Sequence, residues 1–221
     1  MGGMHIVNTG DGSHTVTSRF SGEHYHSTHG AVGESLHVFL RHGLDALGPR
    51  AQIRVLEMGF GTGLNALLTR LRARRLEQLI DFVSVESQPL PQSIISQLNY
   101  GRTVEGATDD MLAQLHGASW EEVVQLDPFF RLQKMHARIE EVELVRSFNA
   151  VYYDAFGPAY QPELWTRDLF ARMYDVLLPG GILVTYCAKG QVKRDLREAG
   201  FLVESLPGPP GKREMTRARK V

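Results

Sequence analysis

The stretch IRVLEMGFGTGLN, residues 53–65, decides the fold of this 221-residue chain. A short apolar run leads into three closely spaced glycines, and residues 62–75 then have the composition of a helix. Glycines after a strand let the backbone turn sharply and approach a ligand closely, while the N-terminus of the next helix offers unpaired N–H groups. The stretch therefore predicts a strand, a ligand-binding turn and a helix in succession.

The same alternation of strand and helix patterns continues along the chain. Further apolar runs occupy residues 82–86, 129–136, 151–154 and 181–187, and helical patterns occupy 91–98, 107–115, 162–178 and 192–199. Strands separated by helices imply right-handed crossovers and a mostly parallel sheet covered on both faces. The sequence therefore predicts an α/β, Rossmann-like fold.

Two hairpins are expected to flank this sheet. Asp11-Gly12 is typical of a tight turn, so residues 6–19 predict a small N-terminal hairpin, followed by a loop and a helix over 34–47. Residues 201–206 and 212–220 surround a Pro/Gly turn and predict a C-terminal antiparallel hairpin. We expect one domain over residues 1–221, with an N-terminal extension (1–50) and an α/β core (51–221).

Composition excludes several classes of site. The chain has 24 Lys and Arg against 25 Asp and Glu, a net charge of −1, so nucleic acid must be met by a local basic patch. Cys187 is the only cysteine, which excludes an intramolecular disulfide and a cysteine zinc cluster. No apolar run is long enough to cross a bilayer, and we expect a cytoplasmic protein with no membrane contact.

The carboxyl ends of the first two core strands each carry an acid, Glu57 and Glu86. A pyrophosphate-binding turn would need glycine at 64, where this chain has Leu64. A carboxylate at Glu57 opposes a pyrophosphate and attracts the cationic amino-acid end of S-adenosylmethionine, while Glu86 can accept hydrogen bonds from ribose hydroxyls. The alternative is that both acids are solvated residues at strand ends. The predicted cofactor-binding residues are Glu57, Gly59, Phe60, Gly61, Thr62, Gly63, Glu86, His136, Ala137 and Asp154.

Asp154 follows the apolar run 151–153 at the ligand-binding edge of a parallel sheet. Methyl transfer from a sulfonium mainly requires a neutral amine held at contact distance and correctly aimed. Asp154 can hydrogen-bond such an amine, stabilise its developing charge or take its proton, and it is the predicted catalytic residue. The alternative is that Asp154 only caps the helix that follows it, and that Phe156 and Trp165 are core residues.

Four segments together resemble one family. EMGFGTGLN (57–65), DAFGPAYQPELW (154–165), GKREM (211–215) and ESLHVF (34–39) are similar to the methyltransferase domain of the MnmC family, which completes 5-methylaminomethyl-2-thiouridine at the tRNA wobble position. The glycine turn occurs in all methyltransferases of this fold, whereas the second and third segments are specific to the family. The resemblance runs from about residue 11 to 217. It implies a class I S-adenosylmethionine-dependent methyltransferase, with Asp154 beside the methyl group and the acceptor amine.

The resemblance also implies an acceptor side and partners. The expected substrate-binding residues are His29, Glu34, Phe156, Pro158, Lys189, Lys212 and Arg213. Two-domain members of the family carry an FAD-dependent oxidase, which this chain does not include, so we expect no flavin chemistry and a separate enzyme that supplies the amine. The tRNA would be met through local basic patches, and the last fifteen residues carry a net charge of +4. An ordinary solvated hairpin explains these charges equally well.

Two other sequence patterns, and the function itself, leave alternatives open. His24, His26 and His29 form a cluster, but no acid or cysteine completes a metal site, and a place in the acceptor pocket is more plausible. The arginines at 70, 72, 74 and 75 suit the C-terminal end of a helix and are interpreted as structural. Rival functions are a methyl- or aminopropyl-transferase acting on a small-molecule amine, and a non-catalytic RNA-binding or scaffold module.

Overall fold

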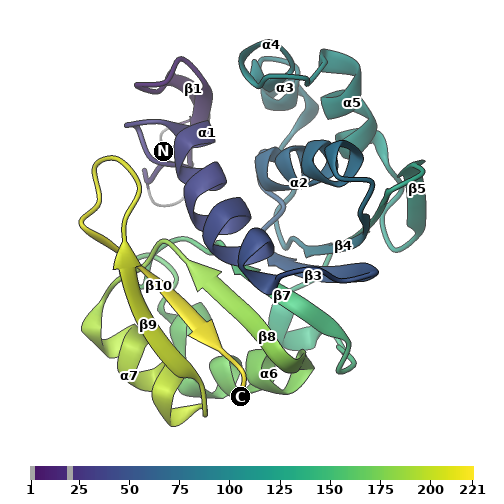
Figure 1. Ribbon diagram of the computed structural model, residues 1–221. Helices are drawn as coiled ribbons and strands as arrows, with labels where there is room; N and C mark the ends of the chain where they lie inside the picture. The colour runs from purple at the N-terminus through teal and green to yellow at the C-terminus, as the bar shows by residue number, and fades with distance from the viewer. Residues whose placement is uncertain (1–2, 19–21) are drawn as a thin grey trace.

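A mixed sheet of eight strands carries helices on both faces in the computed structural model, which describes residues 3–18 and 22–221 (Figure 1). The strands lie in the order β5-β6-β4-β3-β7-β8-β10-β9. The parallel strands are β3 (Gln52–Met58), β4 (Leu79–Val85), β6 (Phe130–Met135), β7 (Phe148–Tyr153) and β8 (Leu177–Thr185). The antiparallel additions are β5 (Val123–Asp127) at one edge and the hairpin of β9 (Leu202–Pro207) and β10 (Glu214–Arg219) at the other.

The central strand β3 is buried on both of its faces. Ile53 and Val55 point into one core, and Leu56 and Met58 point into the other. A strand buried on both faces needs no alternation of apolar and polar residues, and Arg54 and Glu57 are the only polar residues among 53–58. The predicted parallel sheet and its C-terminal hairpin are both confirmed.

Two helical layers supply the partners of these faces (Figure 1). The first layer holds α1 (Ala31–Ser35), the π-helical η1 (Leu36–Leu44), η2 (Asp45–Leu47), α2 (Leu64–Arg75), α3 (Gln92–Ile95), α4 (Tyr100–Thr103) and α5 (Asp109–Gly117). The second layer holds η3 (Ile139–Glu141), η4 (Pro162–Trp165), α6 (Arg167–Val176) and α7 (Gly190–Glu198). Within the described ranges, no helix combines the length and apolar character that crossing a bilayer requires.

The N-terminal extension forms the predicted hairpin and helix, with one difference in geometry. The strands β1 (His5–Asn8) and β2 (His14–Thr17) pair antiparallel around residues 9–13, while Arg19, the last residue of the predicted hairpin, lies outside the described residues. The predicted helix over 34–47 begins earlier, at Ala31, and is π-helical over nine residues. The four-residue spacing of Leu36, Leu40 and Leu44 does not distinguish these helix types, because residues i and i+4 lie on the same side of both.

Two local predictions need correction, and one strand was missed. The helix expected over 91–98 is only four residues long, and the helix expected over 162–178 is interrupted at Thr166, whose hydroxyl accepts the N–H of Leu169 and starts α6. Strand β5 was not predicted. Its residues alternate weakly because it is a largely exposed edge strand, so its sequence carries little of the signal of a buried strand.

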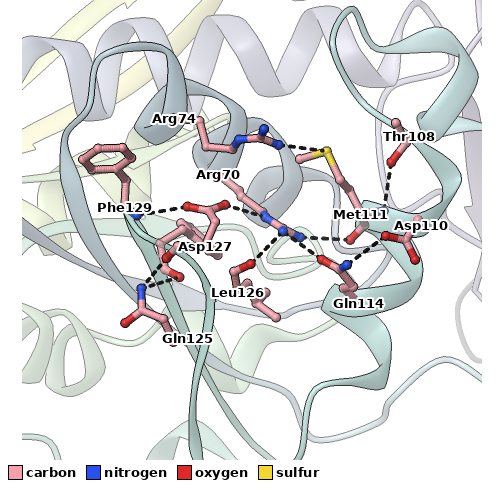
Figure 2. A network of polar contacts seen from close by, with 11 residues as sticks. Arg70, Arg74, Thr108, Asp110, Met111, Gln114, Gln125, Leu126, Asp127 and Phe129 are labelled. Atoms are coloured by element: carbon pink, nitrogen blue, oxygen red, sulfur yellow. Dashed lines mark hydrogen bonds and ion pairs between the residues drawn. The ribbon is translucent and has the colours of Figure 1, made fainter.

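Arg70 joins three elements beside the sheet (Figure 2). Its guanidinium is buried and donates to Asp127 Oδ2 at 2.9 Å, to Gln114 Oε1 at 2.8 Å and to the Leu126 carbonyl at 3.0 Å. These contacts connect α2 with α5 and with the end of β5. Arg70 is therefore structural, as predicted.

Replacing Arg70 by methionine tests this junction. We expect Arg70→Met to lower the free energy of unfolding by about 3 kcal/mol, because Asp127 would keep a nearly buried charge without its cation. Urea denaturation measures the change. The exposed Arg75, in the last turn of the same helix, is the matched control, and Arg75→Met should stay within about 0.5 kcal/mol. Equal effects of the two substitutions would contradict the structural role.

Candidate active site

The carboxyl ends of β3, β4 and β7 meet at one edge of the sheet, where a cavity of about 760 Å³ opens. Its walls come from the glycine turn, the segments after β4, β6 and β7, the N-terminal extension and the turn between β9 and β10. The cavity-lining residues used below are Tyr25, His26, Glu34, Gly59, Phe60, Gly61, Thr62, Asn65, Glu86, Ala137, Asp154, Phe156, Tyr186 and Lys212. The cavity is therefore where most of the predicted site residues come together.

The turn after β3 depends on its three glycines. Gly59, Gly61 and Gly63 have φ values of 90°, 49° and 74°, a region that residues with a side chain rarely adopt. A Cβ atom at Gly61 would also lie 3.0 Å from the ring of Tyr25. The turn consequently brings bare backbone to the cavity, directly before the N-terminus of α2.

Glu86 is held at the cavity wall by backbone donors. Its Oε2 accepts the N–H of Gly61 at 3.0 Å, and its Oε1 accepts the N–H of Gln88 at 2.7 Å. Each oxygen keeps lone pairs for a further donor. This arrangement can accept hydroxyl groups of a ligand, in line with the role predicted for Glu86.

Glu57 lies behind the cavity wall and does not line the cavity. It is 1% exposed, and its Oε2 accepts a 2.6 Å hydrogen bond from Ser84 Oγ on the neighbouring strand. Burial, reinforced by the charges of Asp154 and Glu86, holds the pKa of Glu57 well above its ordinary value. The side chain points to the same face of β3 as Ile53 and Val55, under α2, and its predicted contact with the cofactor stays a prediction.

Asp154 faces the cavity from the end of β7. Asn65 Nδ2 donates to its Oδ2 at 2.8 Å. Burial first, and then the charge of Glu34, raise the pKa of Asp154 well above its ordinary value, while Asn65 and Lys212 act in the opposite direction. A carboxyl group in this setting binds a proton readily at the cavity wall.

Glu34 and Lys212 form an ion pair between the two ends of the chain. Lys212 Nζ lies 2.5 Å from Glu34 Oε2 and 4.0 Å from the centre of the Tyr186 ring. Glu34 is only 4% exposed, and its Oε1 accepts the N–H of Ser27 at 2.9 Å. The pair connects α1 to the turn between β9 and β10 beside Asp154.

Residues 22–30 contact two parts of the cavity wall. The His26 side chain contacts the glycine turn, and the Tyr25 side chain contacts the segment that follows Asp154. His26 Nε2 lies 2.8 Å from Thr62 Oγ1, and the Tyr25 ring meets the Phe156 ring edge to face at 4.9 Å. His24 also lines the cavity, whereas His29 packs against Gly211 outside it. The three histidines thus have separate surroundings, and among the described residues no group of histidine, cysteine or acidic side chains could hold a metal ion.

The remaining predicted residues divide between the cavity and its surroundings. Ala137 lines the cavity, but His136 does not, since its N–H donates to Glu121 Oε1 and its ring packs against Trp120. Pro158, Lys189, Arg213 and His29 also lie outside the cavity lining, and Lys189 and Arg213 are exposed. These outer residues can contact only a ligand that extends beyond the cavity.

The basic C-terminal hairpin is largely neutralised within the molecule. Arg217 and Arg219 both pair with Glu204, at 2.7 and 3.1 Å. Lys220 donates to the Tyr174 carbonyl, and Lys212 is held by Glu34. The local excess of +4 is therefore not an open phosphate-binding surface, because four of its five cations have internal partners.

The sequence did not predict Asn65, Tyr25 and Tyr186, three cavity residues that contact predicted site residues. Asn65 follows the glycine turn, and its polar side chain on a buried helix face was the only signal for a role. Tyr25 and Tyr186 carry no local signal, since the tertiary fold alone brings them to the glycine turn and to Lys212.

Comparison with known proteins agrees with this geometry. Residues 105–221 match a family described as S-adenosyl-L-methionine-dependent methyltransferase. The chain is 35% identical, over 87% of its length and 31% of the relative's, to the tRNA 5-methylaminomethyl-2-thiouridine biosynthesis bifunctional protein MnmC of Cupriavidus necator. The protein of the same name from Aromatoleum aromaticum is 32% identical, with 96% and 34% covered. The chain thus spans about a third of the length of these curated relatives.

A solved structure is similar over nearly the whole chain. The crystal structure of MnmC2 from Aquifex aeolicus superposes with a TM-score of 0.80 at 30% identity, covering 99% of this chain and 70% of that one. The similarity includes the strands and turns that build the cavity.

Acidification tests the buried histidine at the glycine turn. Burial lowers the pKa of His26 from 6.5 to about 4, so the unfolded chain binds a proton at pH 5 that the folded protein does not. Stability present above pH 6.5 should therefore fall by up to about 1.4 kcal/mol per pH unit as the pH drops toward 4. Urea unfolding of the wild type and His26→Gln at pH 7, 6 and 5 measures this, and the variant should show the smaller loss. Parallel pH curves would contradict a neutral, buried His26.

Proposed function

Since this chain belongs to the family of S-adenosyl-L-methionine-dependent methyltransferases, we propose that it methylates the primary amine of a 5-aminomethyl-uridine, with or without the 2-thio group, at the wobble position of tRNA. The observation that carries the proposal is Asp154, a carboxyl group held by Asn65 at the wall of the cavity that also contains the glycine turn. Relatives named for 5-methylaminomethyl-2-thiouridine biosynthesis support the acceptor.

The residues present fit the cofactor. A cavity of about 760 Å³ is within the range of small-molecule sites, roughly 300–1,000 Å³. Glu86 would accept the ribose hydroxyls, the backbone of the glycine turn would hold the amino-acid end, and Ala137 would lie against the base. When bound, the cofactor supplies a methyl group on a sulfonium, which is a good leaving group.

The acceptor amine must lose a proton before it can react. An alkyl amine has a pKa of about 10 and is mostly an ammonium at neutral pH, with no lone pair to donate. Asp154 can attract this ammonium, accept its proton and aim the freed lone pair at the methyl carbon. The cofactor would supply the methyl group to this lone pair and leave as its neutral sulfide, while Asp154 would keep the proton that it has taken.

The ion pair beside Asp154 sets the charge of the acceptor side. Without Lys212, the carboxylate of Glu34 would stand buried and uncompensated near Asp154. With Lys212 in place, the charge of Glu34 is compensated by the ion pair, and Asp154 is the carboxyl group that can take a proton. We assign Glu34, Lys212 and Phe156 to the acceptor pocket.

The tRNA would extend past the cavity over exposed cations. Lys189 and Arg213 are exposed and are the proposed phosphate contacts. The reaction is proposed for the cytoplasm, with a separate enzyme supplying the aminomethyl group. A small-molecule amine is the second candidate acceptor, favoured by the internal pairing of Arg217 and Arg219 and by the net charge of −1.

Removing the carboxyl group tests the role of Asp154. We expect Asp154→Ala to lower the rate of methyl transfer at least about a hundredfold, the usual contribution of a positioned acid or base. Calorimetric binding of the demethylated cofactor should change little. A rate close to that of the wild type would contradict the catalytic role.

A labelling assay decides between the two acceptors. The protein is incubated with methyl-labelled cofactor and either tRNA bearing 5-aminomethyl-2-thiouridine or a panel of free polyamines. Digestion and mass analysis should find the label in 5-methylaminomethyl-2-thiouridine. Label in a polyamine, with none in tRNA, would support the small-molecule acceptor, and tRNA that lacks the aminomethyl group is the matched control.

A further inference from the structure

A buried polar cluster lies beneath the glycine turn, between the sheet and the first turn of α2. Glu57 on β3, Ser84 on β4 and Asn65 on α2 are 1%, 0% and 3% exposed. They lie on the apolar face that also holds Ile53 and Val55. Polar groups buried in such a place are costly unless each finds a hydrogen-bond partner.

The hydrogen bonds of the cluster extend to Asp154, and one buried oxygen of the cluster has no hydrogen-bond donor. Ser84 Oγ donates to Glu57 Oε2 at 2.6 Å, and Asn65 Nδ2 donates to Asp154 Oδ2 at 2.8 Å. The Asn65 amide also interacts with the Glu57 carboxyl. Asn65 Oδ1, however, is buried and accepts no hydrogen bond from any residue that the structure describes.

If Glu57 is protonated, it would supply the donor that this oxygen lacks. Burial raises the pKa of Glu57 well above its ordinary value, and the charges of Asp154 and Glu86 raise it further, against the hydrogen bonds from Ser84 and Asn65. Tyr152, the titratable neighbour on β7, is itself neutral because burial raises its pKa. With Oε2 occupied by Ser84, the proton belongs on Oε1, where it can be donated to Asn65.

The orientation of the Asn65 amide matters for Asp154. The amide presents its NH₂ group to the Asp154 carboxyl, and a donor from Glu57 to its oxygen would hold it in that orientation. Rotated by half a turn, the amide would place an oxygen against that carboxyl, which is repulsive unless Asp154 is protonated. Fixing the amide therefore fixes both the position and the hydrogen bonding of Asp154.

We infer that Glu57 is a positioning residue, which orients Asn65 so that Asn65 holds Asp154 toward the acceptor amine, and that it is not an ionised partner of the cofactor. The inference deepens the proposed function and rests on it, because Asp154 serves the acceptor there. It assigns a role to an acid that the cavity wall hides from the cofactor. It also explains why the first turn of α2 carries a buried asparagine.

Two substitutions of Glu57 separate this role from binding of the cofactor. Glu57→Leu removes the donor to Asn65, and we expect kcat to fall on the order of tenfold, the effect of one lost buried hydrogen bond. The KM and Kd for the cofactor should change less than about threefold. Glu57→Gln keeps an N–H donor and should recover most of the lost rate.

Glu86→Gln is the matched control, since Glu86 lines the cavity and should bind the cofactor directly. It should weaken binding of the demethylated cofactor, measured by calorimetry, more than either Glu57 variant does. Weakening by Glu57→Gln that equals the effect of Glu86→Gln would overturn the inference. So would an unchanged kcat in Glu57→Leu.

An infrared measurement on the folded protein, without acceptor, tests the proton itself. At neutral pH the wild type should show the carbonyl band of a protonated carboxylic acid that disappears in Glu57→Gln and persists in Asp154→Asn. Persistence of that band in Glu57→Gln would overturn the inference. This readout holds if Glu57→Leu fails to fold. It also needs no methyl transfer, so failure of the tRNA assay would reject the proposed acceptor and leave the state of Glu57 to be decided separately.

Discussion

The parallel alignment of β3 between β4 and β7 is the constraint on which the site depends. Because all three strands run in the same direction, their carboxyl ends meet at one edge, and the chain must turn away there into α2 or a loop. That edge receives the glycine turn, Glu86 and Asp154, which lie far apart in the sequence. The cavity is a consequence of sheet topology before it is a property of any side chain.

Three carboxyl groups at this edge have different surroundings and hence different chemistry. Glu86 accepts two backbone N–H groups and keeps lone pairs for further donors, such as hydroxyl groups. Asp154 is held by one amide and is raised in pKa by burial and by Glu34. Glu57 is 1% exposed, and burial holds its pKa well above the ordinary value. One sheet edge thus holds three acids in three settings: one bonded to backbone donors, one at the cavity wall and one buried behind that wall.

The parts of the structure that depend on local pattern were predicted well. The glycine turn, the parallel strands and both hairpins follow from residues close together in the sequence. The orientation of Glu57 was not predictable, because a strand buried on both faces shows no alternation to reveal which side a residue takes. The Glu34–Lys212 pair spans 178 positions, and Tyr25 reaches Gly61 only through the folding of the extension. Such contacts arise from tertiary packing, which no local pattern encodes.

The two sides of the cavity are built by different parts of the chain, and this division bears on specificity. One side, which would hold the cofactor under the proposed function, comes from the turns after β3, β4 and β6, which belong to the sheet itself. The other side, proposed for the acceptor, is completed by the N-terminal extension through Tyr25 and Glu34, and by the β9–β10 turn through Lys212. Since the ion pair joins these two additions directly beside Asp154, a change in either one alters the charge on that side of the cavity without disturbing the glycine turn. Under the proposed function, the choice of acceptor would therefore vary on this scaffold while the means of binding the methyl donor stays the same.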